Sequence, residues 1–239
     1  LADLIDAPIG SSLMGLSVVP SRHPRFLGMQ GMHGHYASSR SMADADLIIC
    51  IGARFSDRAT GNVAKFAKQT KIIHMDIDSA ELDKNVKVDL KICGDIKEAL
   101  VRISAHLEPS PKPGWMAHVG DLRKKEQEIF DRVNPINLLT PYALINEAAK
   151  FADPTTPIVT DVGQHQMWAA QFFPLQQPRT FITSGGLGTM GFGLGAAVGA
   201  SLGTGERTIL FTGDGSFGMN LNELATVFAY KLPVVIIVM

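Results

Sequence analysis

"LFTGDGSFGMNLNELATVFAYKLPVVIIVM", residues 210–239, contains a strand, a turn, a helix and a second strand in one short stretch. The apolar run at its start enters the turn Gly213-Asp214-Gly215, and a second apolar run follows the helical segment from Pro233 onward. Continuous apolar runs of this kind are typical of parallel strands that are buried on both faces of a sheet. The stretch therefore predicts an α/β fold with an aspartate at the carboxyl end of a buried strand.

The same pattern occurs twice more upstream of this stretch. The segments "PIVTDVGQH" (157–165), "TFITSGGLG" (180–188) and "TILFTGDGS" (208–216) each lead a β-rich run into a turn that contains glycine. In open α/β sheets, ligands bind outside the carboxyl ends of the strands. We therefore expect the three turns to converge on one binding site.

A second set of strands precedes this region. "DLIICIG" (46–52) and "KIIHMDI" (71–77) are apolar runs with helical stretches around them, and three prolines interrupt the periodicity within "EPSPKPG" (108–114). The pattern predicts two doubly wound, Rossmann-like parallel-sheet domains, at residues 1–107 and 134–239. Residues 108–133 are expected to form a linker and a charged helix, and Thr140 and Pro141 to begin the first helix of the second domain.

Composition restricts the class of ligand. The 22 basic residues nearly balance the 23 acidic ones, which gives no indication of nucleic-acid binding or of an anionic membrane surface. Cys50 and Cys93 form no Cys-x-x-Cys pair, and no apolar run reaches the ~20 residues of a membrane-spanning helix. We expect a cytoplasmic protein with a small-molecule site, although a targeting peptide on a longer parent chain stays possible.

Two interpretations compete for "GGLGTMG", because Gly186, Gly188 and Gly191 have the G-x-G-x-x-G spacing of dinucleotide-binding turns. Close packing of a helix on a strand explains the glycines equally well.

The turn around Asp214 has free backbone N–H groups and suits a phosphate with its metal ion. A Mg²⁺ ion fits between a carboxylate and a diphosphate, so Asp214 is predicted to be a metal ligand. Asn220 and Glu223, in capping-box spacing, are predicted to cap a helix.

These motifs resemble a known family. Gly213-Asp214-Gly215, followed by a helix and a strand, is similar to the thiamine diphosphate motif, whose closing Asn-Asn pair is expected just after Met239. The strings "DVGQHQMWAAQ", "SGGLGTMGFGLGAA" and "GDGSFGMNLNEL" resemble the cofactor domain of acetohydroxyacid synthase (acetolactate synthase) catalytic subunits. Upstream, "GMHG", "GARFSDRATG", "IIHMDIDSAEL" and "CGDI" resemble the FAD-binding central domain of that family.

The resemblance implies a role for individual residues. Asp214 corresponds to a Mg²⁺ ligand, Met190 to the apolar wedge that bends the cofactor, and Arg58 to the clamp for the carboxylate of the second 2-ketoacid. The other thiamine diphosphate contacts that it implies are Val162, Gly163, Gln164, His165, Gly188, Gly213, Gly215 and Ser216. The FAD contacts that it implies are Met32, His33, Gly52, Arg54, Asp57, Asp76, Ile77, Glu81, Asp95, Ile96, Gln166 and Met167. Without the resemblance, Asp57 and Arg58 are interpreted as a surface ion pair.

The implied activity is decarboxylation of pyruvate and its carboligation to pyruvate or 2-ketobutyrate, in the synthesis of branched-chain amino acids. The family also implies a homodimer or homotetramer with the site between subunits, and a regulatory small subunit. Residues 1–239 alone are expected to be inactive, because the family's catalytic glutamate lies in an amino-terminal domain outside them. Two alternatives stay open: another thiamine diphosphate enzyme, such as a catabolic acetolactate synthase or glyoxylate carboligase, and a flavin- or nucleotide-binding module without catalysis.

Overall fold

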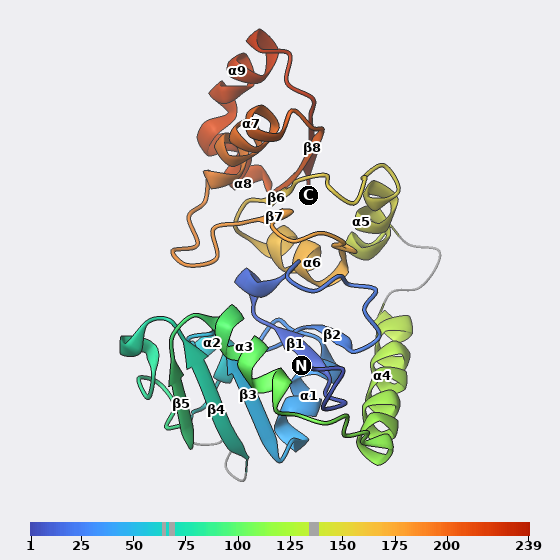
Figure 1. The fold of residues 1–239 in the computed structure, drawn as a ribbon. Coiled ribbons are helices and arrows are strands. Elements are labelled where there is room, and N and C mark those ends of the chain that lie inside the picture. The colour runs from blue at the N-terminus through green and yellow to red at the C-terminus, as the bar shows by residue number, and fades with distance from the viewer. Residues whose placement is uncertain (64–65, 67–69, 134–138) are drawn as a thin grey trace. The chain divides into compact units, whose positions relative to one another are not determined.

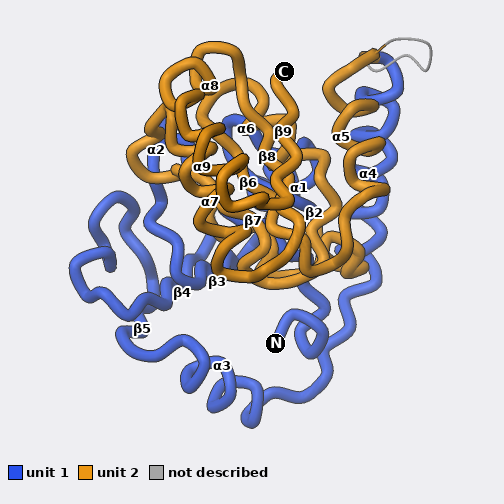
Figure 2. Tube along the Cα trace, turned by 90° about the horizontal axis from the view of Figure 1, so that it is seen from above, with its two compact units in different colours: residues 1–12, 27–132 blue, residues 13–26, 133–239 orange. Residues whose placement is uncertain are grey.

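The computed structural model describes residues 1–63, 66, 70–133 and 139–239. Within it the chain forms two compact units (Figures 1 and 2). Unit 1 comprises residues 1–12 and 27–132, and unit 2 comprises residues 13–26 and 133–239. The predicted start of the second domain, at Asn134, lies outside the described residues.

Unit 1 contains a three-stranded parallel sheet in the order β3-β4-β5 and a separate pair of strands, β1 and β2. Its elements in chain order are β1 (Ile9–Ser11), β2 (Phe26–Met29), α1 (Tyr36–Asp44), β3 (Leu47–Ile51), α2 (Asp57–Thr60), β4 (Lys71–Asp76), η2 (Ser79–Glu81), β5 (Leu90–Cys93), α3 (Ile96–Ala105) and α4 (Pro113–Val133).

The apolar runs of β3 and β4 form the core of this sheet. Cys50, Phe55, Ile72 and Val86 make one buried cluster, and burial raises the pKa of the Cys50 thiol to about 12. A thiol in such surroundings stays protonated and behaves as a small apolar side chain. This confirms both predicted strands and explains why Cys50 lies in the core.

Unit 2 contains a four-stranded parallel sheet in the order β7-β6-β8-β9. Its elements in chain order are η1 (Leu13–Gly15), α5 (Pro141–Ala149), β6 (Ile158–Thr160), α6 (Gln164–Phe172), β7 (Phe181–Ile182), α7 (Phe192–Thr204), β8 (Thr208–Thr212), α8 (Asp214–Asn220), η3 (Leu221–Glu223), α9 (Leu224–Ala229) and β9 (Val234–Val238).

The central strand β8 is buried along its whole length, as its continuous apolar sequence predicts. Helix α7 packs on the sheet through Leu194 and Ala197, which contact Val159 and Leu210. A Cβ atom on Gly193 would approach Leu210 Cδ1 to 2.9 Å, so this glycine lets the helix lie close to the sheet. Close packing thus accounts for at least one glycine of the region.

The structure confirms parallel α/β sheets in both halves of the chain, but it groups two segments differently from the sequence prediction. Helix α4 begins at Pro113, and residues up to 132 group with unit 1 and not with a separate linker. Residues 13–26 group with unit 2, where Ser21 N donates a hydrogen bond to Leu175 O. That segment has no helical or strand periodicity, so its sequence gives no sign of this long-range packing.

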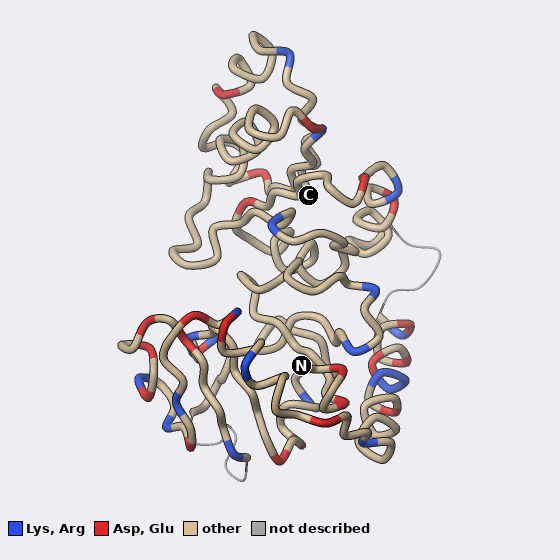
Figure 3. Tube along the Cα trace, viewed as in Figure 1, with Lys and Arg blue, Asp and Glu red and all other residues tan. Residues whose placement is uncertain are grey.

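Charged residues of both signs are interspersed along each unit and along α4 (Figure 3). No extended run of one sign interrupts this mixture in the part of the chain that the structure describes. The arrangement agrees with the balanced composition of the sequence. None of the described helices is long and apolar enough to cross a membrane.

Candidate functional site

The turns that follow β6, β7 and β8 lie together at one edge of the unit 2 sheet, as the order of its parallel strands predicts. Ser216 Oγ, after β8, donates a hydrogen bond to Val162 O, after β6, at 3.1 Å. Met190, in the segment after β7, has its Cε 3.5 Å from the position that a Cβ atom on Gly215 would take. The three turns therefore build one composite site at the carboxyl ends of the strands.

Asp161 joins two of these turns from inside the protein. Its side chain is 1% exposed, and it accepts hydrogen bonds from Gly191 N at 2.9 Å and from Gly193 N at 3.0 Å. The first N–H groups of α7 thus already have a carboxylate as acceptor. The N–H groups of Gly191 and Gly193 are therefore not free to bind a dinucleotide phosphate, whereas residues 185–190 of "GGLGTMG" are exposed.

In the Gly213-Asp214-Gly215 turn, by contrast with the start of α7, the polar groups face outward. Gly213 is the N-cap residue of α8, and Asp214 is its exposed first residue. The backbone N–H groups of Asp214, Gly215 and Ser216 have no acceptor among the described residues. An anion or a metal ion with its anionic ligand could bind here.

His165 lies directly beneath this turn. The residue is 4% exposed, and its Nε2 is buried with no hydrogen-bond partner among the described residues. A Cβ atom on Gly213 would lie 3.1 Å from His165 Nδ1, so the glycine leaves room for the ring. Burial lowers the pKa of His165, and this effect outweighs the nearby Asp161 carboxylate, which raises it. A buried ring nitrogen without a partner is a candidate ligand contact.

The other predicted thiamine diphosphate contacts surround this turn. Gly163 is the N-cap residue of α6 and Gln164 is its exposed first residue, so both lie at the carboxyl end of β6. Gly188 has a φ of +65°, a conformation that favours glycine, and Met190 is 44% exposed. The structure thus brings the predicted residues of unit 2 to one edge of the sheet.

Two side chains near the site act differently from the sequence prediction. Asn220 does not cap the following helix: its Nδ2 donates to Gly191 O, which connects α8 to the start of α7. Glu223 accepts hydrogen bonds from Thr226 Oγ1 and Asn222 Nδ2, so the proposed capping box is absent. The predicted capping role was wrong because the spacing alone does not show whether a side chain bonds to its own helix or to a neighbouring turn.

The predicted flavin contacts of unit 1 lie mainly at the carboxyl ends of β3, β4 and β5. Gly52 follows β3 with a φ of +62°, and a Cβ atom there would lie 3.2 Å from Ile96 Cδ1. Asp76 ends β4 with 7% exposure and accepts a hydrogen bond from Asp78 N, whereas Ile77 is 71% exposed. Asp95 follows β5 and caps α3 through Glu98 N.

Further predicted contacts border the same edge. Glu81 accepts a hydrogen bond from Lys84 Nζ through Oε1, while its Oε2 is buried without a partner among the described residues. Arg54 is exposed, and its carbonyl oxygen accepts from Asn85 Nδ2. An unpartnered buried carboxylate oxygen would suit a ligand hydroxyl group.

The loop of residues 31–34 packs against α2. Met32 N donates to Arg58 O at 2.8 Å, and Arg58 Nη1 lies 3.5 Å from Met32 Sδ. Asp57 accepts a hydrogen bond from Arg58 N and forms no ion pair with the Arg58 guanidinium among the described contacts. The alternative of a surface ion pair is therefore wrong, and the exposed guanidinium beside Met32 can reach a ligand.

Gln166 and Met167 lie in α6 of unit 2, whereas the other predicted flavin contacts lie in unit 1. Gln166 Nε2 donates to Thr183 Oγ1 at 2.7 Å, and Thr183 Oγ1 also accepts from Thr160 Oγ1. The Gln166 side chain thus connects the ends of β6 and β7. In the structure it contributes to the order of the turns.

Sequence reasoning missed Asp161. Its position immediately after β6, at the carboxyl end of a strand that faces the site, was the available signal. Its burial and its two glycine donors could not be read from the pattern, because they depend on α7 beginning beside β6.

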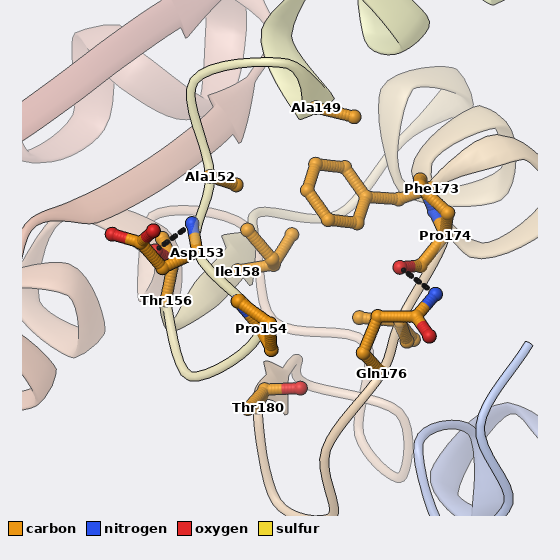
Figure 4. A pocket seen from close by; sticks show the side chains of 11 residues that line it. Ala149, Ala152, Asp153, Pro154, Thr156, Ile158, Phe173, Pro174, Gln176 and Thr180 are labelled. Carbon is orange, nitrogen blue, oxygen red and sulfur yellow. Dashed lines mark hydrogen bonds between the residues drawn. The ribbon is translucent and has the colours of Figure 1, made fainter.

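A cavity of about 140 Å³ lies in unit 2, away from these turns. It is lined by residues that precede β6 and β7, such as Thr156 and Thr180, and by the segment after α6. Figure 4 shows Phe173 and Ile158 beside it, with the hydrogen bond from Gln176 Nε2 to Pro174 O. Because it lies at the amino ends of the strands, it is separate from the candidate site.

Comparison with known proteins gives a match for each of the two parts of the chain. Residues 1–103 match the thiamine pyrophosphate enzyme central domain, and residues 161–239 match the C-terminal TPP binding domain of such enzymes. Acetolactate synthase isozyme 1 large subunit of Escherichia coli K12 is 45% identical over all of this chain, which covers 42% of that relative.

Two relatives from other domains of life are similar to the same extent. A probable acetolactate synthase large subunit of Methanocaldococcus jannaschii is 42% identical over 99% of this chain, which covers 41% of the relative. Acetolactate synthase 2, chloroplastic, of Nicotiana tabacum is 40% identical over 99% of this chain, which covers 36% of the relative. The chain thus spans about two-fifths of the length of the relatives it matches.

Proposed function

Because the chain belongs to the thiamine pyrophosphate enzyme family, we propose that the full-length protein carrying it is an acetolactate synthase. Its substrates are two molecules of pyruvate, or pyruvate and 2-ketobutyrate. One observation of the structure supports this proposal most directly: an exposed aspartate turn lies above the buried His165, whose Nε2 lacks a partner among the described residues. The site combines a metal-binding carboxylate with polar groups for a diphosphate.

The residues of unit 2 fit thiamine diphosphate. The free N–H groups at the start of α8 can donate to diphosphate oxygens, and His165 Nε2 supplies a buried polar contact. Asp214 can hold Mg²⁺, which neutralises the repulsion between its carboxylate and the diphosphate. When bound, thiamine diphosphate supplies the electron sink for decarboxylation of a 2-ketoacid. The protein residues bind and orient it.

Mg²⁺ needs further ligands beyond Asp214. No group of three or more His, Cys, Asp or Glu side chains suited to a metal occurs in the part of the chain that the structure describes. In diphosphate sites, Mg²⁺ binds through one or two carboxylates together with phosphate oxygens and water. Asp214 is thus the charged protein ligand that these residues contribute.

Unit 1 is proposed to bind FAD at the carboxyl edge of its sheet. The positive φ of Gly52 lets backbone approach a ligand closely, and Glu81 Oε2 and Asp76 offer carboxylate oxygens to hydroxyl groups. The loop of residues 31–34 and the exposed Ile77 extend this edge. These features fit a flavin dinucleotide, and FAD binding is tested below together with the positioning of this loop.

Interaction with other chains is also proposed. The relatives from E. coli are called large subunits, a name that implies a small subunit. By analogy, the full-length protein is proposed to form a homodimer or homotetramer and to bind a regulatory small subunit.

The proposal is tested by incubating the purified full-length protein with pyruvate, Mg²⁺, thiamine diphosphate and FAD, and by measuring acetolactate. Acetolactate formation that requires both Mg²⁺ and thiamine diphosphate is the expected result. Carboligation of glyoxylate in place of pyruvate would identify a different enzyme of the family. Binding of FAD without any turnover of 2-ketoacids would favour the non-catalytic alternative.

Arg58→Lys should raise the KM for the second 2-ketoacid about tenfold, with little change in the affinity for thiamine diphosphate. Arg58 is exposed beside the loop of residues 31–34, and its planar guanidinium can bind a carboxylate through two parallel hydrogen bonds. Lysine keeps the charge but loses this geometry. Steady-state kinetics with pyruvate and 2-ketobutyrate, each varied in turn, measure the change.

Arg102→Lys provides the matched control, because Arg102 lies on α3 with a side chain that is 80% exposed. It should leave both KM values unchanged. Unaltered kinetics of Arg58→Lys would exclude Arg58 from acceptor binding.

A further inference from the structure

The loop of residues 31–34 is connected to α1 by a network of backbone contacts. Gly34 N donates to Gly31 O, and His35 N donates to Met29 O, so the chain turns sharply before α1. Gly31 N donates to Ser39 Oγ within α1 at 3.3 Å. Hydrogen bonds therefore join the start of α1 to the loop that contacts Arg58.

The start of α1 lacks a capping side chain of its own. Its N-cap residue is His35, whose side chain makes no capping hydrogen bond to the helix. Glu126, 91 residues further along the chain in α4, supplies the missing acceptor: its Oε1 lies 2.6 Å from His35 Nδ1, and its Oε2 accepts from Ala37 N at 2.7 Å. One carboxylate thus holds both the N-cap residue and a helical N–H group.

His35 is also fixed from its other side. Gly28, in β2, has a φ of +82°, and a Cβ atom there would lie 2.2 Å from His35 Cδ2. The ring therefore lies directly on the strand backbone and has little freedom to move with Glu126. The Glu126 carboxylate therefore contacts a ring whose position is fixed by the strand.

The charge state of Glu126 agrees with this geometry. Partial burial raises the pKa of its carboxyl, but the hydrogen bonds from His35 and Ala37 N, together with nearby positive charge, reverse the effect and lower that pKa. Glu126 is therefore ionised at neutral pH, and both of its hydrogen bonds are charge-assisted.

We infer that Glu126 is a positioning residue, which fixes the loop of residues 31–34 and Arg58 for binding of FAD and of the second 2-ketoacid. The inference rests on the proposed function. It follows from a continuous series of contacts in unit 1: Glu126 to His35 and Ala37, these to the loop, and Met32 N to Arg58 O. Glu126 acts through these residues.

The test compares Glu126→Ala with Glu128→Ala in the full-length protein. Glu128 is the matched control, because it lies on the same helix, is exposed and has no partner among the described contacts. Hydrogen exchange measures protection of the amides of residues 31–37, and flavin titration gives the Kd of FAD. Kinetics give KM for each 2-ketoacid and kcat separately.

For Glu126→Ala we expect exchange at Ala37 N to accelerate at least tenfold, while the amides of β3 and β4 keep their protection. The Kd of FAD should rise about tenfold, equivalent to about 1.4 kcal/mol. The KM of the second 2-ketoacid should rise by several-fold, and the Kd of thiamine diphosphate should stay unchanged. Glu126→Gln keeps one acceptor oxygen, so its effects should be smaller. Glu128→Ala should match the wild type.

Three results would overturn the inference. Unchanged exchange at residues 31–37 would show that Glu126 does not hold the loop, and faster exchange with unchanged FAD and 2-ketoacid binding would restrict it to a structural role. A uniform loss of protection that includes β3 and β4 would indicate general destabilisation. Failure of the proposed function is separate: the wild-type protein would then bind no FAD or form no acetolactate, whatever residue occupies position 126.

Discussion

Asp214→Asn in the full-length protein should weaken Mg²⁺-dependent binding of thiamine diphosphate at least a hundredfold and reduce acetolactate formation to below about 1% of the wild type. The carboxylate is exposed at the start of α8 and has no protein partner among the described residues that could replace it. Asparagine keeps the size of the side chain but removes the charge that holds the cation beside the diphosphate. Titration with cofactor at several Mg²⁺ concentrations measures the change.

Asp153→Asn is the control for this experiment. Asp153 is an exposed aspartate of the same unit, but it precedes β6 and so lies at the opposite edge of the sheet. Its replacement should leave binding and turnover unchanged. If Asp214→Asn retained Mg²⁺-dependent cofactor affinity close to that of the wild type, the metal site would have to lie elsewhere, and our assignment of the composite site would be wrong.

Strand β5 was not predicted, because its sequence "LKIC" is short and its residues are exposed or half-buried. The other strands of the two parallel sheets were predictable because each lies in an apolar or β-rich run. β8 is the clearest example, since all five of its residues are buried. Once the strands are parallel, their carboxyl ends must share one edge, and this geometric constraint brings together the turns at Gly163, Gly188 and Asp214. The approximate location of the candidate site therefore follows from local sequence alone.

The connections between turns were not predictable, because they depend on contacts between residues far apart in the chain. Asp161 caps a helix that starts some thirty positions later, and Glu126 caps one that starts ninety positions earlier. Neither has the short spacing of a local capping motif. Asn220 shows the opposite error, because a capping-box spacing was present but the side chain bonds to Gly191 O. Capping predicted from spacing holds where the acceptor is local, as at Thr140.

Asp161→Asn should lower the free energy of unfolding of unit 2 by about 2–3 kcal/mol, although asparagine has almost the same shape as aspartate. Asp161 Oδ1 accepts from Val162 N and Gly191 N, and Oδ2 accepts from Gly193 N. The amide has only one oxygen, so in either orientation its NH₂ group faces a backbone N–H donor. The residue is 1% exposed, so water cannot relieve this conflict.

Two measurements separate this local effect from a general loss of stability. Hydrogen exchange at Gly191 and Gly193 should accelerate more than exchange in β8, and the melting temperature of unit 2 should fall by about 10 °C. Asp153→Asn again serves as the control, with no change expected in either quantity. Because the capped helix start lies next to Gly188 and Met190, the same substitution should also weaken thiamine diphosphate binding. A fully stable Asp161→Asn protein would mean that α7 does not depend on the buried carboxylate, and the composite site would then have to be ordered by other contacts, such as those of Ser216, Asn220 and Gln166.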